Sequence, residues 1–122
     1  VNVHIIEPCG FDLNDSRFKR VVMDYIGFSK IFRYEDYSMF IKKNKKSRII
    51  LMTTKAKKSY HKFKFKKDDM LLFGRESAGV PESLHKSINH KLKVPINKKT
   101  RSLNVATTVA IAISEALRQN NF

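Results

Sequence analysis

The feature that most constrains this chain is its C-terminal stretch, residues 98–119, the only long segment with helical periodicity. One set of its apolar residues recurs at steps of three and four and so shares a helix face: Leu103, Ala106, Ala110, Ile113 and Leu117. A second apolar face adjoins it, formed by Val105, Val109, Ala112 and Ala116. A helix that is apolar over most of its circumference is normally buried. We therefore expect the domain to cover one face, with a partner chain as a candidate cover for the other.

A polar loop, residues 98–102, leads into this helix. It ends in Ser102, whose hydroxyl can accept a hydrogen bond from the free amides of the first turn, so we expect Ser102 to be the N-cap. The helix start would then be rich in donors and partly positive. Taken alone, the pattern of this segment is also typical of an ordinary C-terminal core helix with a capping serine.

The length of 122 residues, with 42% apolar content, predicts one domain with a real core. No run of residues approaches the length of a membrane span. The single cysteine, Cys9, excludes an internal disulfide framework and fits a reducing cytoplasm, where we expect the protein to be located. Val1 lies inside an expected strand, without an initiator methionine, so we expect the chain to lack the beginning of its gene product.

The charge is strongly unbalanced, with 25 lysines and arginines against 11 acidic residues and a formal net charge of +14. Such an excess indicates a polyanionic partner, most simply RNA or DNA. Lysine-rich genome composition is the alternative explanation.

Apolar runs alternate with helical patterns along the chain, which predicts an α/β fold with a mainly parallel sheet and helices on both faces. We expect strands at residues 1–6, 31–34, 48–53, 70–73 and 92–94. We expect helices at residues 16–23, 37–42 and 81–88, the first two capped by Asp15 and Asp36. Phe63 and Phe65 alternate with lysines and predict either a short edge strand or a hydrophobic anchor under a loop.

The strongest local motif is LLFGRESAGVP, residues 71–81, in which a buried strand runs directly into a loop with two glycines. Gly74 would let the backbone approach a ligand closely, and Gly79 would permit a tight turn. Glu76 between them is a candidate site residue, or a carboxylate that holds the loop or caps the next helix. The loop matches neither the dinucleotide-binding glycine pattern nor the P-loop.

Three strand ends carry loops of this kind: Met52-Thr53-Thr54, Gly74-Arg75-Glu76, and Val94-Pro95 leading to Ser102-Leu103-Asn104. Ligands of open α/β sheets bind beyond the carboxyl ends of strands. Together the three segments resemble the SpoU-type RNA 2′-O-ribose methyltransferases of the SPOUT superfamily, in which FGxExxGxP and a loop such as RSLNVA are signature motifs. The resemblance is greatest to the small tRNA enzymes that methylate the wobble-position ribose. HIIEPCGF at residues 4–11 and EALRQ at residues 115–119 extend it over the whole chain.

The resemblance implies a single SPOUT domain over residues 1–122, with a deep C-terminal trefoil knot that binds S-adenosylmethionine. It also implies a homodimer that uses the last helix. Carried over by position, the cofactor site would comprise Met52, Thr53, Gly74, Glu76, Val94, Pro95, Ser102, Leu103 and Asn104.

Two departures from the family pattern limit what can be carried over. The first motif, with its N-terminal strand and helix and the arginine proposed to activate the ribose hydroxyl, would precede Val1, so the catalytic base is not assigned. Glu76, Ser102 and Asn104 are supporting candidates only. Some close relatives also carry arginine where this chain has Ala78.

The implied reaction is methyl transfer to an RNA 2′-oxygen, which requires alignment and deprotonation of the hydroxyl. We expect no metal, because the four histidines lack paired-ligand spacing with Cys9. The candidate RNA contacts are Arg17, Arg20, Lys55 and Arg101, with Lys19, Lys57, Lys58, Lys98 and Lys99 beside them. Methylation of ribosomal RNA and a non-catalytic RNA-binding role are the alternatives to a tRNA methyltransferase.

Overall fold

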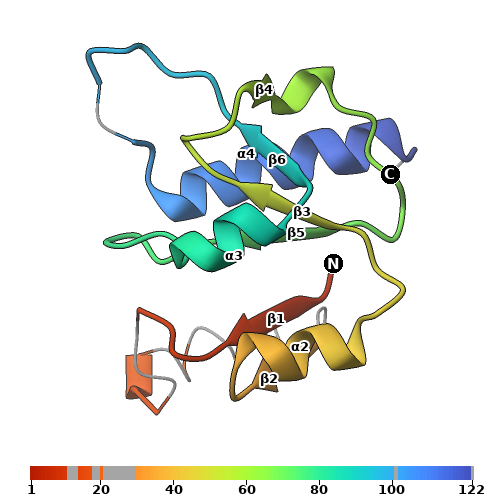
Figure 1. The fold of residues 1–122 in the computed structure, drawn as a ribbon, viewed down its shortest axis with the longest axis vertical. Helices are drawn as coiled ribbons and strands as arrows, with labels where there is room; N and C mark the ends of the chain where they lie inside the picture. The colour runs from red at the N-terminus through yellow and green to blue at the C-terminus, as the bar shows by residue number, and fades with distance from the viewer. Residues whose placement is uncertain (11–13, 18–19, 21–29, 101, 122) are drawn as a thin grey trace. The chain divides into compact units, whose positions relative to one another are not determined.

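The computed structural model describes residues 1–10, 14–17, 20, 30–100 and 102–121, which form two compact units (Figure 1). The first unit spans Val1–Lys46 and the second spans Ser47–Phe122, and each contains its own sheet. All ladders between the described strands are parallel, which confirms the predicted α/β class with parallel strands. The strands are divided between two sheets, however, where the sequence predicted one.

The described residues of the first unit include a two-stranded sheet and a short helix. Strand β1 (Val3–Ile6) pairs with β2 (Ile31–Tyr34), with Val3 opposite Ile31. Helix α2 (Tyr37–Lys43) begins at Asp36, whose Oδ1 accepts from the backbone N–H of Met39 at 2.8 Å, as its sequence predicted. Of the helix expected at 16–23, residues 16, 17 and 20 are helical and the others lie outside the described residues.

The second unit has a four-stranded sheet in the order β4-β6-β3-β5. Strand β3 (Ile49–Met52) lies between β5 (Met70–Phe73) and β6 (His90–Lys93), and the short strand β4 (Lys58–Ser59) forms one edge. An inner parallel strand is typically a continuous apolar run, and IILM is such a run. Met52 at the end of β3 lies opposite both Phe73 and Leu92, so three strands end side by side at one edge of the sheet.

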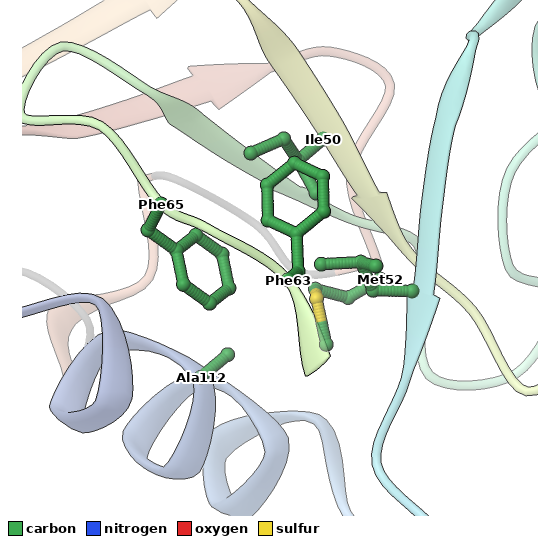
Figure 2. Packing of buried hydrophobic residues seen from close by; sticks show 6 residues of the cluster. Ile50, Met52, Phe63, Phe65 and Ala112 are labelled. Atoms are coloured by element: carbon green, nitrogen blue, oxygen red, sulfur yellow. The ribbon is translucent and has the colours of Figure 1, made fainter. Parts of the chain in front are cut away.

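Helix α4 (Val105–Gln119) packs one of its two apolar faces into the core of this unit (Figure 2). Ala112 is fully buried and points toward Phe63 and Phe65, in a cluster that also contains Ile50 and Met52. This is the second of the two faces that the sequence indicated. On the other face, Ala106 and Ala110 are exposed, whereas Leu103, which the sequence placed on this face, precedes the helix and is exposed there. No helix in the described part of the chain is both long and apolar enough to cross a membrane.

Phe63 and Phe65 are buried anchors in a segment that follows a 3-10 turn, Tyr60–Lys62, so the anchor alternative is confirmed and the edge-strand alternative is wrong. The edge strand is β4 instead, five residues earlier. The backbone of the anchor segment pairs with a side chain of α4. Gln119 accepts from the N–H of Phe65 at 2.9 Å and donates to the carbonyl of Phe63 at 3.0 Å.

The start of α4 corrects one prediction, because the N-cap is Asn104 and Ser102 precedes the helix. The side-chain oxygen of Asn104 accepts from the N–H groups of Ala106 at 2.8 Å and Thr107 at 3.4 Å. Both serine and asparagine cap well, and the helix begins at the later of the two. Helix α3 (Glu82–Ser87) also begins one residue later than predicted. The sequence placed Pro81 in the first helical turn, and the structure has it as the N-cap residue.

Candidate functional site

A cavity of about 270 Å³ lies at the edge of the second sheet where β3, β5 and β6 end. Its walls come from the segments that follow these three strands, together with the first turn of α4. The backbone N–H of Thr53 donates to the carbonyl of Leu92 at 2.8 Å, which joins the first of these segments to strand β6. The sequence predicted that loops at these strand ends converge, and the second unit shows this convergence.

Most of the residues named for the cofactor site from the sequence line this cavity: Met52, Thr53, Gly74, Glu76, Val94, Ser102 and Leu103. Pro95 and Asn104 are not among its lining residues. Pro95 is exposed. Asn104 contributes through hydrogen bonds to the lining residue Glu76 and to the backbone N–H of Ala106. Ala78, where some relatives carry arginine, also lines the cavity and contributes only a methyl group there.

The 74–80 loop closes on itself as a tight hairpin at one wall of the cavity. Arg75 and Gly79 exchange two backbone hydrogen bonds, of 3.2 Å and 2.7 Å. Gly79 has a φ of +64°, which confirms the tight turn predicted for it. A Cβ on Gly74 would lie 2.5 Å from the carbonyl carbon of Gly79. Gly74 therefore permits a close approach within its own hairpin, and the approach to a ligand that the sequence suggested stays a prediction.

Asn104 connects this hairpin to the start of α4. Its Nδ2 donates to Oε1 of Glu76 at 2.9 Å while its Oδ1 caps the helix. Glu76 thus holds two walls of the cavity together, which is the loop-holding role left open for it by the sequence. A carboxylate whose oxygen accepts a side-chain amide also has a fixed orientation, so the charge of Glu76 stands at a defined place beside the cavity.

Several lining residues were not named as site candidates from the sequence, among them His85, Ile96 and Thr108. His85 comes from α3, and its Nε2 lies 3.5 Å from Oγ1 of Thr53. No motif indicated His85, because it reaches the cavity only through the packing of α3. Thr108 could have been found from its spacing: it is four residues after Asn104, whose carbonyl accepts its hydroxyl at 3.1 Å.

The residues predicted to contact RNA are basic and accessible where they are described. Arg17 is exposed and pairs with Asp15 at 3.2 Å, and Arg20 is exposed in the same unit. In the second unit Lys55 lines the cavity and pairs with Glu82 at 3.6 Å. Arg101 lies outside the described residues.

No group of three or more His, Cys, Asp or Glu side chains that could hold a metal occurs among the residues that the structure describes. His4 is a packed residue of the first unit: its Nδ1 lies 3.0 Å from the Tyr34 hydroxyl, and its ring stacks on Phe32. Burial lowers the pKa of His4. His90 likewise packs its ring against Phe63.

Comparison with known proteins places these features in a family. The model of the SpoU rRNA Methylase family matches residues 1–114. A protein of Beijerinckia indica named tRNA (cytidine(34)-2′-O)-methyltransferase is 42% identical over 98% of this chain and 76% of its own length. A solved structure described as giving insights into 2-OH methylation of C/U34 on tRNA superposes with a TM-score of 0.88, at 32% identity, over 97% of this chain and 78% of that one.

A more distant structure shares the fold. The SpoU methyltransferase AviRb of Streptomyces viridochromogenes, solved in complex with AdoMet, superposes with a TM-score of 0.85 at 16% identity. The match covers 98% of this chain and 50% of that protein.

Proposed function

This chain belongs to the SpoU rRNA Methylase family, and from that premise we propose that it is a tRNA 2′-O-ribose methyltransferase that uses S-adenosylmethionine. Its substrate is the wobble nucleotide of the anticodon loop, a cytidine or uridine, as the names of its similar relatives state for those proteins. The observation that carries the proposal is the cavity where three strand-end segments meet, since most of the residues named from the family motifs line it.

The cavity suits a compact ligand with apolar and polar parts. Its volume of about 270 Å³ lies just below the range of roughly 300–1,000 Å³ for small-molecule sites. The lining combines apolar side chains, such as Met52 and Leu103, with polar groups from Thr53, Glu76 and Ser102. We propose that it binds S-adenosylmethionine in the bent conformation that the family resemblance implies.

When bound, S-adenosylmethionine supplies the methyl group that is transferred to the ribose oxygen. The task of this chain is to hold donor and acceptor in line, because correct positioning supplies much of the rate of such a transfer. The 74–80 hairpin and the Ser102–Leu103 segment both contribute to the wall, and the Asn104–Glu76 hydrogen bond joins the hairpin to the start of α4. We assign Glu76 and Asn104 positioning roles on this ground.

The finer features that the family resemblance implies are part of the proposal. The C-terminal segment would be threaded as a trefoil knot, and the protein would act in the cytoplasm as a homodimer. The exposed small-residue face of α4, with Ala106 and Ala110, supports contact with a second copy of this helix. Replacing Ala110 by glutamate should convert dimer to monomer in analytical ultracentrifugation if α4 lies in the interface.

The direct test combines ligand binding with product mapping. Calorimetry with S-adenosylhomocysteine should give micromolar-range binding, and incubation with tRNA and the methyl donor should add one ribose methyl at the wobble nucleotide, detected by mass spectrometry of nuclease fragments. Methylation of ribosomal RNA in place of tRNA would move the proposal to the alternative substrate. Absence of binding and of methylation would leave a non-catalytic RNA-binding protein.

A further inference from the structure

A second concavity lies beside the cofactor cavity, and the charged side chains that line it are all basic. It has a volume of about 460 Å³ and is lined by Lys55, Lys57, Lys58 and Lys91, with His85 and His90. We call it the lysine hollow. The structure describes all of the residues that line it, and none of these residues is acidic. A concavity with four ammonium groups and no carboxylate is complementary to an anion.

The floor of the lysine hollow is apolar and rigid. Phe63 and Leu92 form part of it, and both are buried. The ammonium of Lys58 lies over the ring of Phe63, 5.2 Å from its centroid, and the ring of His90 packs edge-on against Phe63 at 5.6 Å. This cation–π contact favours a position of the Lys58 ammonium near the floor.

The charges of the hollow are largely uncompensated within the described residues. Lys57, Lys58 and Lys91 have no carboxylate within 4.0 Å there. Lys55 pairs with Glu82 at 3.6 Å, but both side chains are more than 60% exposed. An exposed pair of this kind contributes little and is readily exchanged for another anion.

The lysine hollow adjoins the cofactor cavity through shared residues. Lys55 and His85 line both concavities, and Nε2 of His85 lies 3.5 Å from Oγ1 of the cavity residue Thr53. Other exposed lysines of the same unit, such as Lys64 and Lys67, line neither concavity. The basic charge of the hollow therefore reflects a local grouping of lysines beside the site, in addition to the general excess of lysine on the surface.

We propose that the lysine hollow binds the phosphodiester backbone of the substrate RNA next to the nucleotide whose ribose is methylated. The proposal rests on the proposed function, which places the reacting ribose at the neighbouring cavity. A nucleotide that inserts its ribose there brings its flanking phosphates to the rim shared by Lys55 and His85. Other proteins bind single-stranded nucleic acid in the same way, through a positively charged groove that follows its backbone. The hollow therefore positions the RNA without reading its sequence.

The test compares two double variants that remove equal charge. Lys57→Gln with Lys91→Gln removes two ammonium groups from the hollow, and Lys64→Gln with Lys67→Gln is the matched control outside it. Binding of a fluorescent tRNA is followed by anisotropy over a series of salt concentrations. For single-stranded contacts each lost phosphate contact lowers the slope of log K against log salt by about 0.7, so the hollow variant should lose about 1.4. Its affinity should fall by about tenfold at low salt.

The control variant should retain most of the wild-type slope, and both variants should bind S-adenosylhomocysteine as the wild type does. In steady-state kinetics the hollow variant should raise KM for tRNA with little change in kcat, because the contact is uniform binding. Equal loss of slope in both variants would overturn the proposal in favour of diffuse attraction by the net charge. The proposed function alone would be refuted if the wild-type protein bound tRNA but neither bound S-adenosylhomocysteine nor methylated the tRNA. In that case the salt slopes of the two variants would still test whether the lysine hollow binds RNA.

Discussion

Replacing Gly74 by alanine tests whether the shape of the 74–80 hairpin forms the cofactor site. The added Cβ would lie 2.5 Å from the carbonyl carbon of Gly79, 2.6 Å from its Cα and 2.8 Å from the nitrogen of Val80. All three atoms belong to the backbone, so no flexible side chain can move aside. Restoring an ordinary contact of 3.4 Å requires the two arms of the hairpin to separate by about 0.9 Å.

Two effects of this separation can be estimated. Overpacking of this kind costs about 1–3 kcal/mol of folding free energy, which for a chain of this size lowers Tm by roughly 4 °C per kcal/mol. The hairpin is also a wall of the proposed cofactor cavity, and displacing a positioning element by nearly 1 Å can cost about 100-fold in rate. Gly74→Ala should therefore lose most of its methyl-transfer activity while remaining folded.

Gly79→Ala is the matched control, since it adds the same atom to the other arm. Nothing lies within 4 Å of a Cβ at Gly79, but its φ of +64° strains any residue with a side chain. The control should lose stability, by about 1–2 kcal/mol, with little change in affinity for S-adenosylhomocysteine. Calorimetry and thermal unfolding of both variants provide the comparison. Wild-type affinity and Tm in Gly74→Ala would refute the reasoning.

Three further predictions concern the ends of α4. Asn104→Ala should cost about 1 kcal/mol through the lost cap and should weaken S-adenosylhomocysteine binding in calorimetry more than tRNA binding; Asn104→Ser should recover the stability only. Gln119→Leu leaves two partly buried backbone groups unpaired and should cost about 2–4 kcal/mol in urea unfolding; an unchanged midpoint would contradict this. Hydrogen bonds from Arg118 and then Gln119 hold the pKa of Glu115 at about 2, below its ordinary 4.5. Because the folded-state pKa is the lower one, its stabilising effect is present above pH 4.5 and is lost as the pH falls toward 2. Glu115→Gln should flatten the stability curve in that window.

Local sequence signals predicted the elements of this chain well where one signal dominated. Asp36 followed by an apolar-periodic segment gave the start of α2, and the run IILM gave the inner strand β3. Ser102 and Asn104 are both good caps two residues apart, and only the packing of α4 decides between them. Strand β4 has two residues, too few to show a period, and its pairing with β6 depends on tertiary structure.

The cavity was predictable to the extent that it is built from strand ends. Met52, Gly74 and Ser102 belong to segments that a parallel sheet brings to one edge, and each lines the cavity. His85 could not be found in this way, because it lies inside a helix and reaches the cavity through the placement of α3 against the sheet. The Asn104–Glu76 bond was equally hidden, since its partners are 28 residues apart in the chain.

The construction of the cavity from three distant segments also couples its ligand to the survival of the fold. Residues near positions 52, 74 and 102 share one wall only when the sheet and α4 are both in place. A ligand that binds only the intact cavity therefore stabilises the folded state against partly open forms. At a ligand concentration of about a hundred times Kd, the free energy of unfolding rises by about 2.7 kcal/mol. In a cell depleted of methyl donor this protein would be exposed to proteases more often, so its abundance would follow the supply of its own substrate.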